Sequence, residues 1–197
     1  MEYVNIIKKI MIMKKTLYSI LMLVGVLVAF SSCEKEEIGN TATVETAGEW
    51  YVVVDAADAN GNLYVDSDGD SWEDPFGVGR IHMMTYNTAA NDPNEMIVTD
   101  MGNFWDFTVK VKCDQNNLTF STNTTANNNM VEGYEDINVT ITGGKIIKDG
   151  AVTPSGSKAD YIEFYVSFSD DSYPAAYGYT NYRVSGYRYT GFVDDEE

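Results

Sequence analysis

The stretch GEWYVVVDA, Gly48 to Ala56, places apolar side chains at every second position. Trp50, Val52 and Val54 fall on one face of this stretch. Successive side chains of a β-strand point to opposite faces, so this period predicts a strand with one buried face. The stretch therefore favours an all-β fold in which such strands are the repeated unit.

The same alternation recurs along the chain as far as Phe192, most clearly in DYIEFYVSF, Asp160 to Phe168. Turn-forming segments separate the apolar runs; they are NGN, NDPN, CDQNN, TGGK and PSGS. We expect about eight to ten short strands and no long helix after Cys33. Strands joined in series by turns predict an antiparallel up-and-down barrel, because closure leaves no exposed sheet edge.

The N-terminal part of the chain has the order of a targeting sequence. MKKTLYSILMLVGVLVAF, from Met13, has two lysines, an apolar run and then small residues, as a secretory signal does. The run of about 14 residues is shorter than the roughly 20 that cross a bilayer, which disfavours a transmembrane anchor. We expect residues 1–12 to be a start-site artefact, residues 13–32 a cleaved lipoprotein signal peptide and residues 33–47 a lipidated cysteine with a flexible acidic tether.

The cysteine at the end of this leader has a distinctive setting. FSSC, Phe30 to Cys33, resembles a bacterial lipobox, which implies that Cys33 carries acyl chains that anchor the protein to a membrane. The adjoining CEKEE resembles the surface-export signal of Bacteroidetes lipoproteins, and a plain charged tether is the alternative. The expected location is the outer membrane, at the cell surface rather than the periplasmic face.

The part of the chain that follows the leader is strongly acidic. From Cys33 onward it carries 9 Lys and Arg against 29 Asp and Glu, a formal charge of −20, and it ends in an acidic tail at residues 194–197. A field of this sign repels polyanions, so nucleic acid is excluded as a partner of the folded part. We expect a monomer.

Gly48 and Trp50 form a G-x-W pattern that resembles the start of lipocalin-like (calycin) barrels. In that family the tryptophan closes one barrel end and a late arginine covers it, which implies this role for Arg183 or Arg188. Longer segments are similar to the Bacteroidetes family described as "lipid-binding putative hydrolase"; they are MTYNTAANDPNEMIVTDMGNFWDFTVKVKC, GKIIKDGAVTPSGSKADYIEF and GYRYTGF. The resemblance implies a lipid-binding barrel over residues 48–193 and supplies no catalytic residues.

A small hydrophobic, lipid-like ligand is the expected partner of this barrel, because binding sites for small molecules are mostly apolar. Core filling by the same side chains is the alternative, since alternation does not tell which face of a strand is inside. The expected cavity lining is His82, Met84, Tyr86, Trp105, Phe107, Val109, Phe164 and Val166.

Catalytic signatures are weak in this sequence. The chain has one histidine, His82, in a strand, and it contains no G-x-S-x-G elbow. The S-x-x-K match from Ser155 to Lys158 falls in a Pro-Gly turn, and Cys113 alternates with polar residues in FTVKVKC, as a buried inert thiol would. Non-catalytic ligand binding is therefore the predicted function.

Two other functions stay open at this point. One is an accessory protein with a solid core whose outer surface binds a glycan or a partner protein, because exposed tyrosines suit such surfaces. The other is a small lipid or ester hydrolase that uses a constellation of side chains not recognisable from the sequence.

An acidic segment, DSDGDSWED, resembles the calcium loops of secreted repeat proteins. Hard oxygen ligands at this density suit Ca²⁺. The sequence predicts no cofactor, and a structural calcium ion bound by Asp66, Asp68, Asp70 and Asp74 is the alternative to a solvated loop.

Overall fold

The structure is a computed structural model that describes residues 6, 8–9, 11, 13–18, 39–65, 68, 74–123, 126–176 and 178–196. The chain divides into two compact units, Met1–Gly39 and Asn40–Glu197. In the first unit the described residues before residue 19 are helical, whereas the rest of the expected signal peptide and Cys33 lie outside the described residues. Within the described part of the chain, no helix combines the length and the hydropathy needed to cross a membrane.

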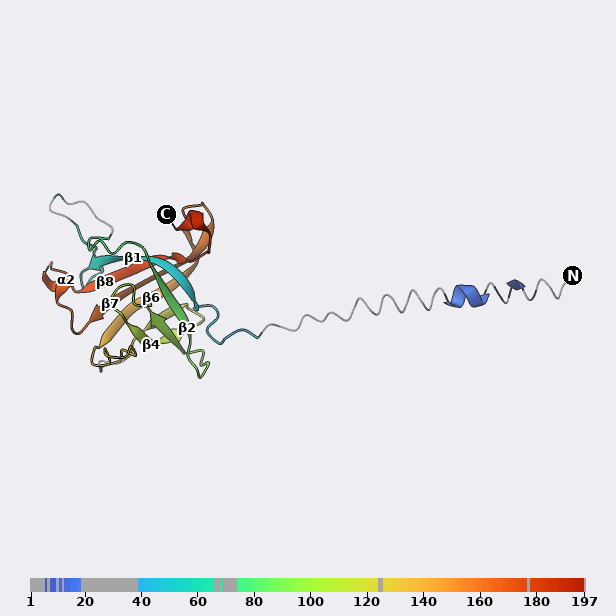
Figure 1. The fold of residues 1–197 in the computed structure, drawn as a ribbon, viewed down its shortest axis with the longest axis horizontal. Helices are drawn as coiled ribbons and strands as arrows, with labels where there is room; N and C mark the ends of the chain where they lie inside the picture. Colours follow the sequence, from blue (N-terminus) through green and yellow to red (C-terminus); the bar gives the residue numbers. More distant parts are fainter. Residues whose placement is uncertain are drawn as a thin grey trace. The chain divides into compact units, whose positions relative to one another are not determined.

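The second unit is a closed barrel of eight antiparallel strands (Figure 1), which confirms the predicted fold class. Each strand pairs with the next along the chain, and β8 returns to pair with β1. The strands are β1 (Gly48–Ala57), β2 (Ile81–Asn87), β3 (Glu95–Thr99), β4 (Thr108–Asp114), β5 (Thr119–Ser121), β6 (Val139–Val152), β7 (Lys158–Phe168) and β8 (Asn181–Arg188). A short helix, α2 (Tyr173–Ala176), precedes β8, and a 3-10 turn, η1 (Val193–Asp195), follows it.

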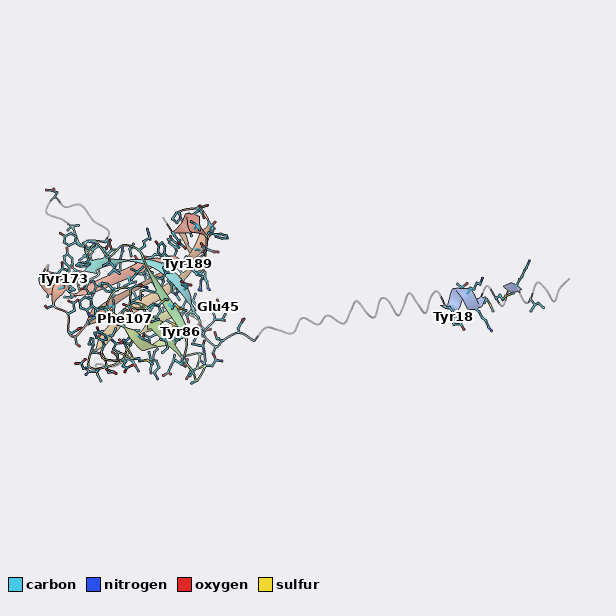
Figure 2. The ribbon with its side chains drawn as sticks, viewed as in Figure 1. Tyr18, Glu45, Tyr86, Phe107, Tyr173 and Tyr189 are labelled. Carbon is cyan, nitrogen blue, oxygen red and sulfur yellow. The ribbon has the colours of Figure 1, made fainter. Side chains whose placement is uncertain are left out.

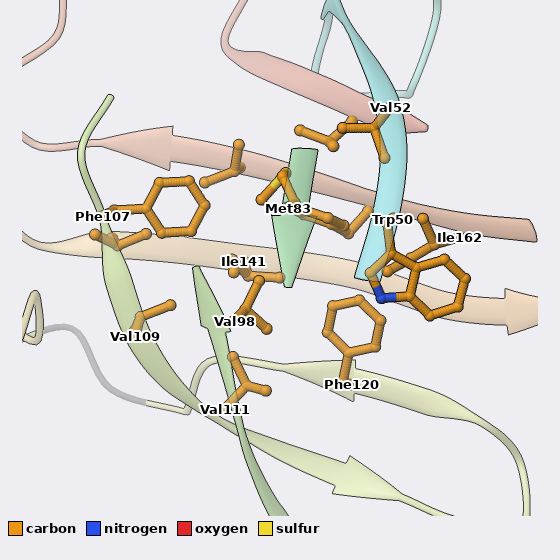
Figure 3. Packing of buried hydrophobic residues seen from close by; sticks show 14 of the residues in the cluster. Trp50, Val52, Met83, Val98, Phe107, Val109, Val111, Phe120, Ile141 and Ile162 are labelled. Carbon is orange, nitrogen blue, oxygen red and sulfur yellow. The ribbon is translucent and has the colours of Figure 1, made fainter. Parts of the chain in front are cut away.

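The interior of the barrel is filled by side chains. Trp50, Phe107, Val109, Phe164 and Val166 are each at most 1% exposed, and they belong to one contiguous cluster that includes residues of all eight strands. Figure 3 shows side chains from opposite walls pointing toward one another. Eight strands enclose a space just wide enough for side chains, and each large apolar side chain buried there stabilises the fold by about 1.5–3 kcal/mol.

Strand β2 presents the opposite face to the one expected from its sequence. Ile81, Met83 and Thr85 are buried, whereas the alternate positions, among them His82 and Met84, lie on the outer face. Both faces carry a methionine, so the period-two pattern alone does not choose between them. The outer row, which ends at Tyr86, therefore does not line the interior.

One end of the barrel is closed by Trp50. Its Nε1 donates a hydrogen bond to Thr85 Oγ1 (2.9 Å), and the guanidinium carbon of Arg188 lies 4.5 Å from the centroid of its ring. Arg188 Nη1 also donates to the carbonyl oxygen of Ala47 (2.7 Å). A Cβ on Gly48 would lie 2.0 Å from this Nη1, so the glycine of the G-x-W pattern makes room for the arginine. Arg188 therefore covers the tryptophan.

The other end is the mouth of the barrel. Here β1, β3, β5 and β7 end and β2, β4, β6 and β8 begin. Figure 2 shows Tyr173, from the β7–β8 connection, at the opposite end of the barrel from Glu45 and Tyr86.

Candidate functional site

A groove of about 570 Å³ opens at the mouth of the barrel, and we call it the mouth groove. Binding sites for small molecules commonly measure about 300–1,000 Å³. The lining comes from three connections and the start of strand β8: Phe76, Val78, Phe104, Trp105, Asp170, Asp171, Ser172, Tyr173, Ala176 and Tyr182. Segments far apart in the sequence thus build one apolar concavity with a few polar groups.

Aromatic rings pack against one another around this groove. The ring of Tyr182 lies 4.9 Å from that of Phe104 and 5.2 Å from that of Phe76, measured between centroids. Trp105 stacks on Phe168 with centroids 5.4 Å apart and an interplanar angle of 18°. Such pairs contribute about 0.5–1.5 kcal/mol each beyond the area they bury. The wall of the mouth groove is therefore formed before any ligand arrives.

The β3–β4 connection is held in place by one buried carboxylate. Asp100 is fully buried, and its two oxygens accept backbone N–H groups from five residues at 2.7–3.1 Å. Among these donors are Phe104 and Trp105, whose side chains line the groove. Hydrogen bonds to a charged acceptor contribute about 1.5–3 kcal/mol each, so Asp100 fixes the backbone that presents both rings.

Two adjacent carboxylates stand at the rim of the mouth groove. Asp171 accepts hydrogen bonds from the Tyr182 hydroxyl and from the Tyr173 backbone N–H, and Asp170 accepts one from Trp105 Nε1 (3.3 Å). Burial, assisted by the bond to Asp171, raises the pKa of Tyr182 well above its ordinary value of 10, which keeps the hydroxyl a donor. The rings and the acids are thereby locked to one another.

The β1–β2 connection is anchored by a second buried acid. Asp55 is 1% exposed, lies 2.6 Å from Arg183 Nη2 and accepts the backbone N–H of Asp74 (2.9 Å). The carboxylate of Asp74 in turn accepts the N–H groups of Val78 and Gly79, both at 2.8 Å. Arg183 therefore supports this connection, not the closed end of the barrel.

The calcium ligands expected from the sequence are only partly described. Asp66 and Asp70 lie outside the described residues, and each carboxylate oxygen of Asp74 accepts one backbone N–H group. Within the described residues, no group of three or more His, Cys, Asp or Glu side chains is placed to hold a metal ion. The calcium site, which also includes Asp68, stays a prediction.

The candidate catalytic side chains lie apart from the mouth groove. His82 Nδ1 is 2.9 Å from Glu49 Oε1, on the outer face of the barrel. Cys113 Sγ is 3.3 Å from the Pro93 carbonyl oxygen, and burial raises the pKa of its thiol, which lowers the thiolate fraction. Ser155 lies in the turn between β6 and β7, hydrogen-bonded to neighbouring hydroxyls. Among these three side chains, the described contacts join no nucleophile to a base.

The eight residues expected to line a cavity fall into three places. Phe107, Val109, Phe164 and Val166 fill the core, and His82, Met84 and Tyr86 lie on the outer face. Trp105 lines the mouth groove. The structure thus brings none of the other seven to the groove that Trp105 lines.

Sequence reasoning missed most of the mouth groove because its residues come from connections. Phe104 and Tyr173 belong to no alternating run that singles them out. The sequence contains one signal: Asp100 follows the segment MIVT and precedes a glycine two residues later, a pattern typical of side-chain-capped turns. It indicates a fixed turn, but not that the turn carries a site.

An antiparallel barrel closed at one end by Trp50 and Arg188, with an aromatic groove at the other, defines a binding-protein architecture. The chain belongs to the family described as "lipid-binding putative hydrolase", whose model matches residues 35–193. A search of curated proteins finds no match. Family and fold together support a lipid-binding protein.

Proposed function

We propose that this protein is a cell-envelope lipoprotein that binds a small hydrophobic, lipid-like ligand in the mouth groove and does not catalyse a reaction. The observation that carries the proposal is the groove itself, a preformed apolar concavity of about 570 Å³ in a member of a lipid-binding family. Its volume suits one acyl-like chain or a small ring system. Because side chains fill the interior of the barrel, we propose that the ligand binds at its mouth and not inside it.

The apolar part of the ligand lies against the rings of Phe76, Phe104 and Trp105 in this proposal. Burying apolar surface stabilises a complex by about 25 cal/mol per Å² before the cost of immobilising the ligand is subtracted. Because buried Tyr182 and Asp100 hold these rings in place, little ordering accompanies binding. A preformed groove keeps that cost low.

The absence of catalysis is part of the proposal and rests on what surrounds the candidate groups. The one histidine contacts Glu49, Tyr51 and Tyr189 on the outer face, away from the mouth groove. Nucleophilic catalysis needs a base within hydrogen-bond reach of the nucleophile. Hydrolysis of ester substrates that disappears in His82→Ala would contradict this part.

Native mass spectrometry of the protein purified from its natural host tests the binding function. We expect an adduct of lipid mass, and we expect Val78→Asp, which places a charge in the groove, to abolish it. The matched control is Val152→Asp, because Val152 is 69% exposed at the far end of β6. An adduct that survives Val78→Asp would place the ligand elsewhere, and no adduct in the unmodified protein would contradict ligand carriage.

Anchoring at the outer membrane, on the cell surface, completes the proposal and rests on the lipobox-like FSSC and the following CEKEE. Acyl chains on Cys33 would hold the barrel at a membrane from which a lipid-like ligand can be taken. Cys33→Ser should release the protein from the membrane fraction, and protease added to whole cells should digest the unmodified protein. Retention of the variant in the membrane fraction would contradict acyl anchoring.

A second function is favoured by the filled interior. A barrel with a solid core suits an accessory protein, and in that case the mouth groove would hold an apolar side chain of a partner protein or a sugar ring. The mass measurement separates the two functions, because a partner protein or a glycan has a mass unlike that of a lipid.

A further inference from the structure

The polar side of the mouth groove has one sign of charge. Asp170 and Asp171 line it, and no lysine or arginine stands among its described lining residues. Asp55 of β1 and Glu163 of β7 differ in this respect, because Asp55 pairs with Arg183 and Glu163 pairs with Lys145. A pair of carboxylates beside apolar rings therefore faces the groove without a cationic partner from the described chain.

Each rim carboxylate is positioned but not saturated. Oδ1 of Asp170 accepts a hydrogen bond from the Trp105 indole N–H. The two oxygens of Asp171 accept one each from the Tyr182 hydroxyl and the Tyr173 backbone N–H. All three donors are neutral, so they orient the acids and leave their charge uncompensated. A carboxylate oxygen accepts about two hydrogen bonds, which leaves capacity for a donor on a ligand.

The aromatic rings of the groove also favour a cationic ligand. A cation is attracted to the face of an aromatic ring, and recognition of ammonium groups by several rings together with acids is a recurring use of this attraction. Phe76 and Tyr173 lie 5.4 Å apart between centroids, and Tyr173 is 48% exposed beside the two acids. The net charge of −20 from Cys33 onward adds a field that concentrates cations near the protein.

An apolar ligand body that enters the groove removes water from the rim. Desolvation of a carboxylate is costly unless an opposite charge or a hydrogen-bond donor replaces the water. An anionic head would add electrostatic repulsion to the cost of desolvating the carboxylates. A neutral head would offset only part of that cost, and a cationic head would offset it.

We propose that the ligand of the mouth groove is an amphiphile whose polar end carries an alkylammonium group, held by Asp170, Asp171 and the ring of Tyr173. This inference rests on the proposed function and names the class of ligand for the same groove. The ammonium has two possible sources, the zwitterionic head of a lipid or a simple cationic amphiphile, and both present the same group to the rim.

The test compares four probes with one ten-carbon chain and different heads. They are decyltrimethylammonium, decylphosphocholine, 1-decanol and decanoate, titrated below their micelle concentrations into the unit Asn40–Glu197 and followed by calorimetry. This unit contains all eight strands and the contiguous core, so it is expected to fold alone. We expect decyltrimethylammonium to bind about tenfold more tightly than 1-decanol, and decanoate to bind more weakly than 1-decanol.

Isosteric variants locate the effect at the rim. Asp170→Asn keeps an acceptor for the Trp105 indole and should weaken decyltrimethylammonium about three- to fivefold while changing 1-decanol less than about twofold. Asp171→Asn repeats the test, and a thermal melt checks that each variant is folded. Asp194→Asn is the control for net charge, since Asp194 is exposed in η1 beyond the closed-end terminus of β8.

The outcomes distinguish a failure of the charge inference from a failure of the proposed ligand-binding function. Equal affinity for decyltrimethylammonium and 1-decanol, or tighter binding of decanoate, overturns the charge inference and leaves the groove as a ligand site. Failure of all four probes to bind overturns the proposed function as well. Decylphosphocholine that binds as tightly as decyltrimethylammonium supports a lipid head as the source, and weaker binding of decylphosphocholine supports a simple cationic amphiphile.

Discussion

Replacing Asp100 by asparagine probes the link between a buried acid and the mouth groove. Oδ1 of Asp100 accepts two backbone N–H groups and Oδ2 accepts three. In Asp100→Asn the amide nitrogen takes one of these places, so at least two N–H groups face a donor. A hydrogen bond to a charged acceptor contributes about 1.5–3 kcal/mol, which gives about 3 kcal/mol or more if the donors stay buried.

Part of this loss is recovered because the connection lies at the surface. Met101, Gly102 and Asn103 are exposed and can hydrate when the turn opens. We therefore expect Asp100→Asn to lower the free energy of unfolding by about 2–4 kcal/mol and to weaken 1-decanol binding, since Phe104 and Trp105 lose their fixed backbone.

Urea unfolding followed by circular dichroism measures the first effect, and calorimetric titration with 1-decanol measures the second. Asp92→Asn is the matched control: one oxygen of Asp92 accepts two donors of Asn94 at the opposite end of the barrel, and an asparagine oxygen can replace it. We expect this control to change stability by less than about 0.5 kcal/mol. Equal stability of the two variants, or unchanged 1-decanol affinity in Asp100→Asn, would refute the reasoning.

Three further predictions concern the barrel and its chemistry. Gly186→Ala should lower the free energy of unfolding by more than about 2 kcal/mol and Gly48→Ala by less, because the new Cβ would lie 2.1 Å from a backbone oxygen of β1 in the first case and 2.0 Å from the far end of the long Arg188 side chain in the second. Equal losses in urea unfolding would argue against this. Burial alone would raise the pKa of Asp160, but hydrogen bonds from a backbone N–H and two cationic side chains hold it below 3.8. The ionised acid therefore stabilises the fold above that pH, and the stability gap between the natural protein and Asp160→Asn should narrow as the pH falls below 3.8, whereas a constant gap would contradict the assignment. His82→Ala should leave any turnover of nitrophenyl esters unchanged, and its loss would identify a catalytic role.

The fold was predictable because most strands of the barrel show apolar residues at alternate positions in their own local sequence. Trp50, Val52 and Val54 mark the buried face of β1, and runs of the same kind mark β4 and β7. In β2 the pattern failed, because Met83 and Met84 offer comparable apolar side chains on opposite faces. Burial there is decided by pairing with β1 and β3, which the sequence of β2 alone does not contain.

The site was less predictable, because it is made where strands stop. Trp105 was expected to contact a ligand, but its partners Phe168 and Tyr182 come from β7 and β8. The closure of the barrel brings these segments together, and Asp100 and Asp55 fix the connections by backbone hydrogen bonds and an ion pair. Such contacts produce no regular residue pattern in the sequence that could have predicted them.

The binding place that we propose for the ligand follows from how the barrel is filled. Trp50 and Phe164 occupy the interior and are at most 1% exposed, so a ligand there would have to displace side chains whose removal costs several kcal/mol each. The mouth groove requires no such displacement. Binding at the mouth also leaves the polar end of a ligand beside the rim acids.

The most direct test is an NMR titration of the isotope-labelled unit Asn40–Glu197 with 1-decanol, read at the tryptophan indole N–H signals. Trp105 Nε1–H lies in the mouth groove beside Asp170, whereas Trp50 Nε1–H lies at the closed end beside Thr85. Variants with each tryptophan replaced by phenylalanine assign the signals. Binding at the mouth predicts that the Trp105 signal shifts while the Trp50 signal stays in place, and a shift of Trp50 with an unmoved Trp105 would contradict it.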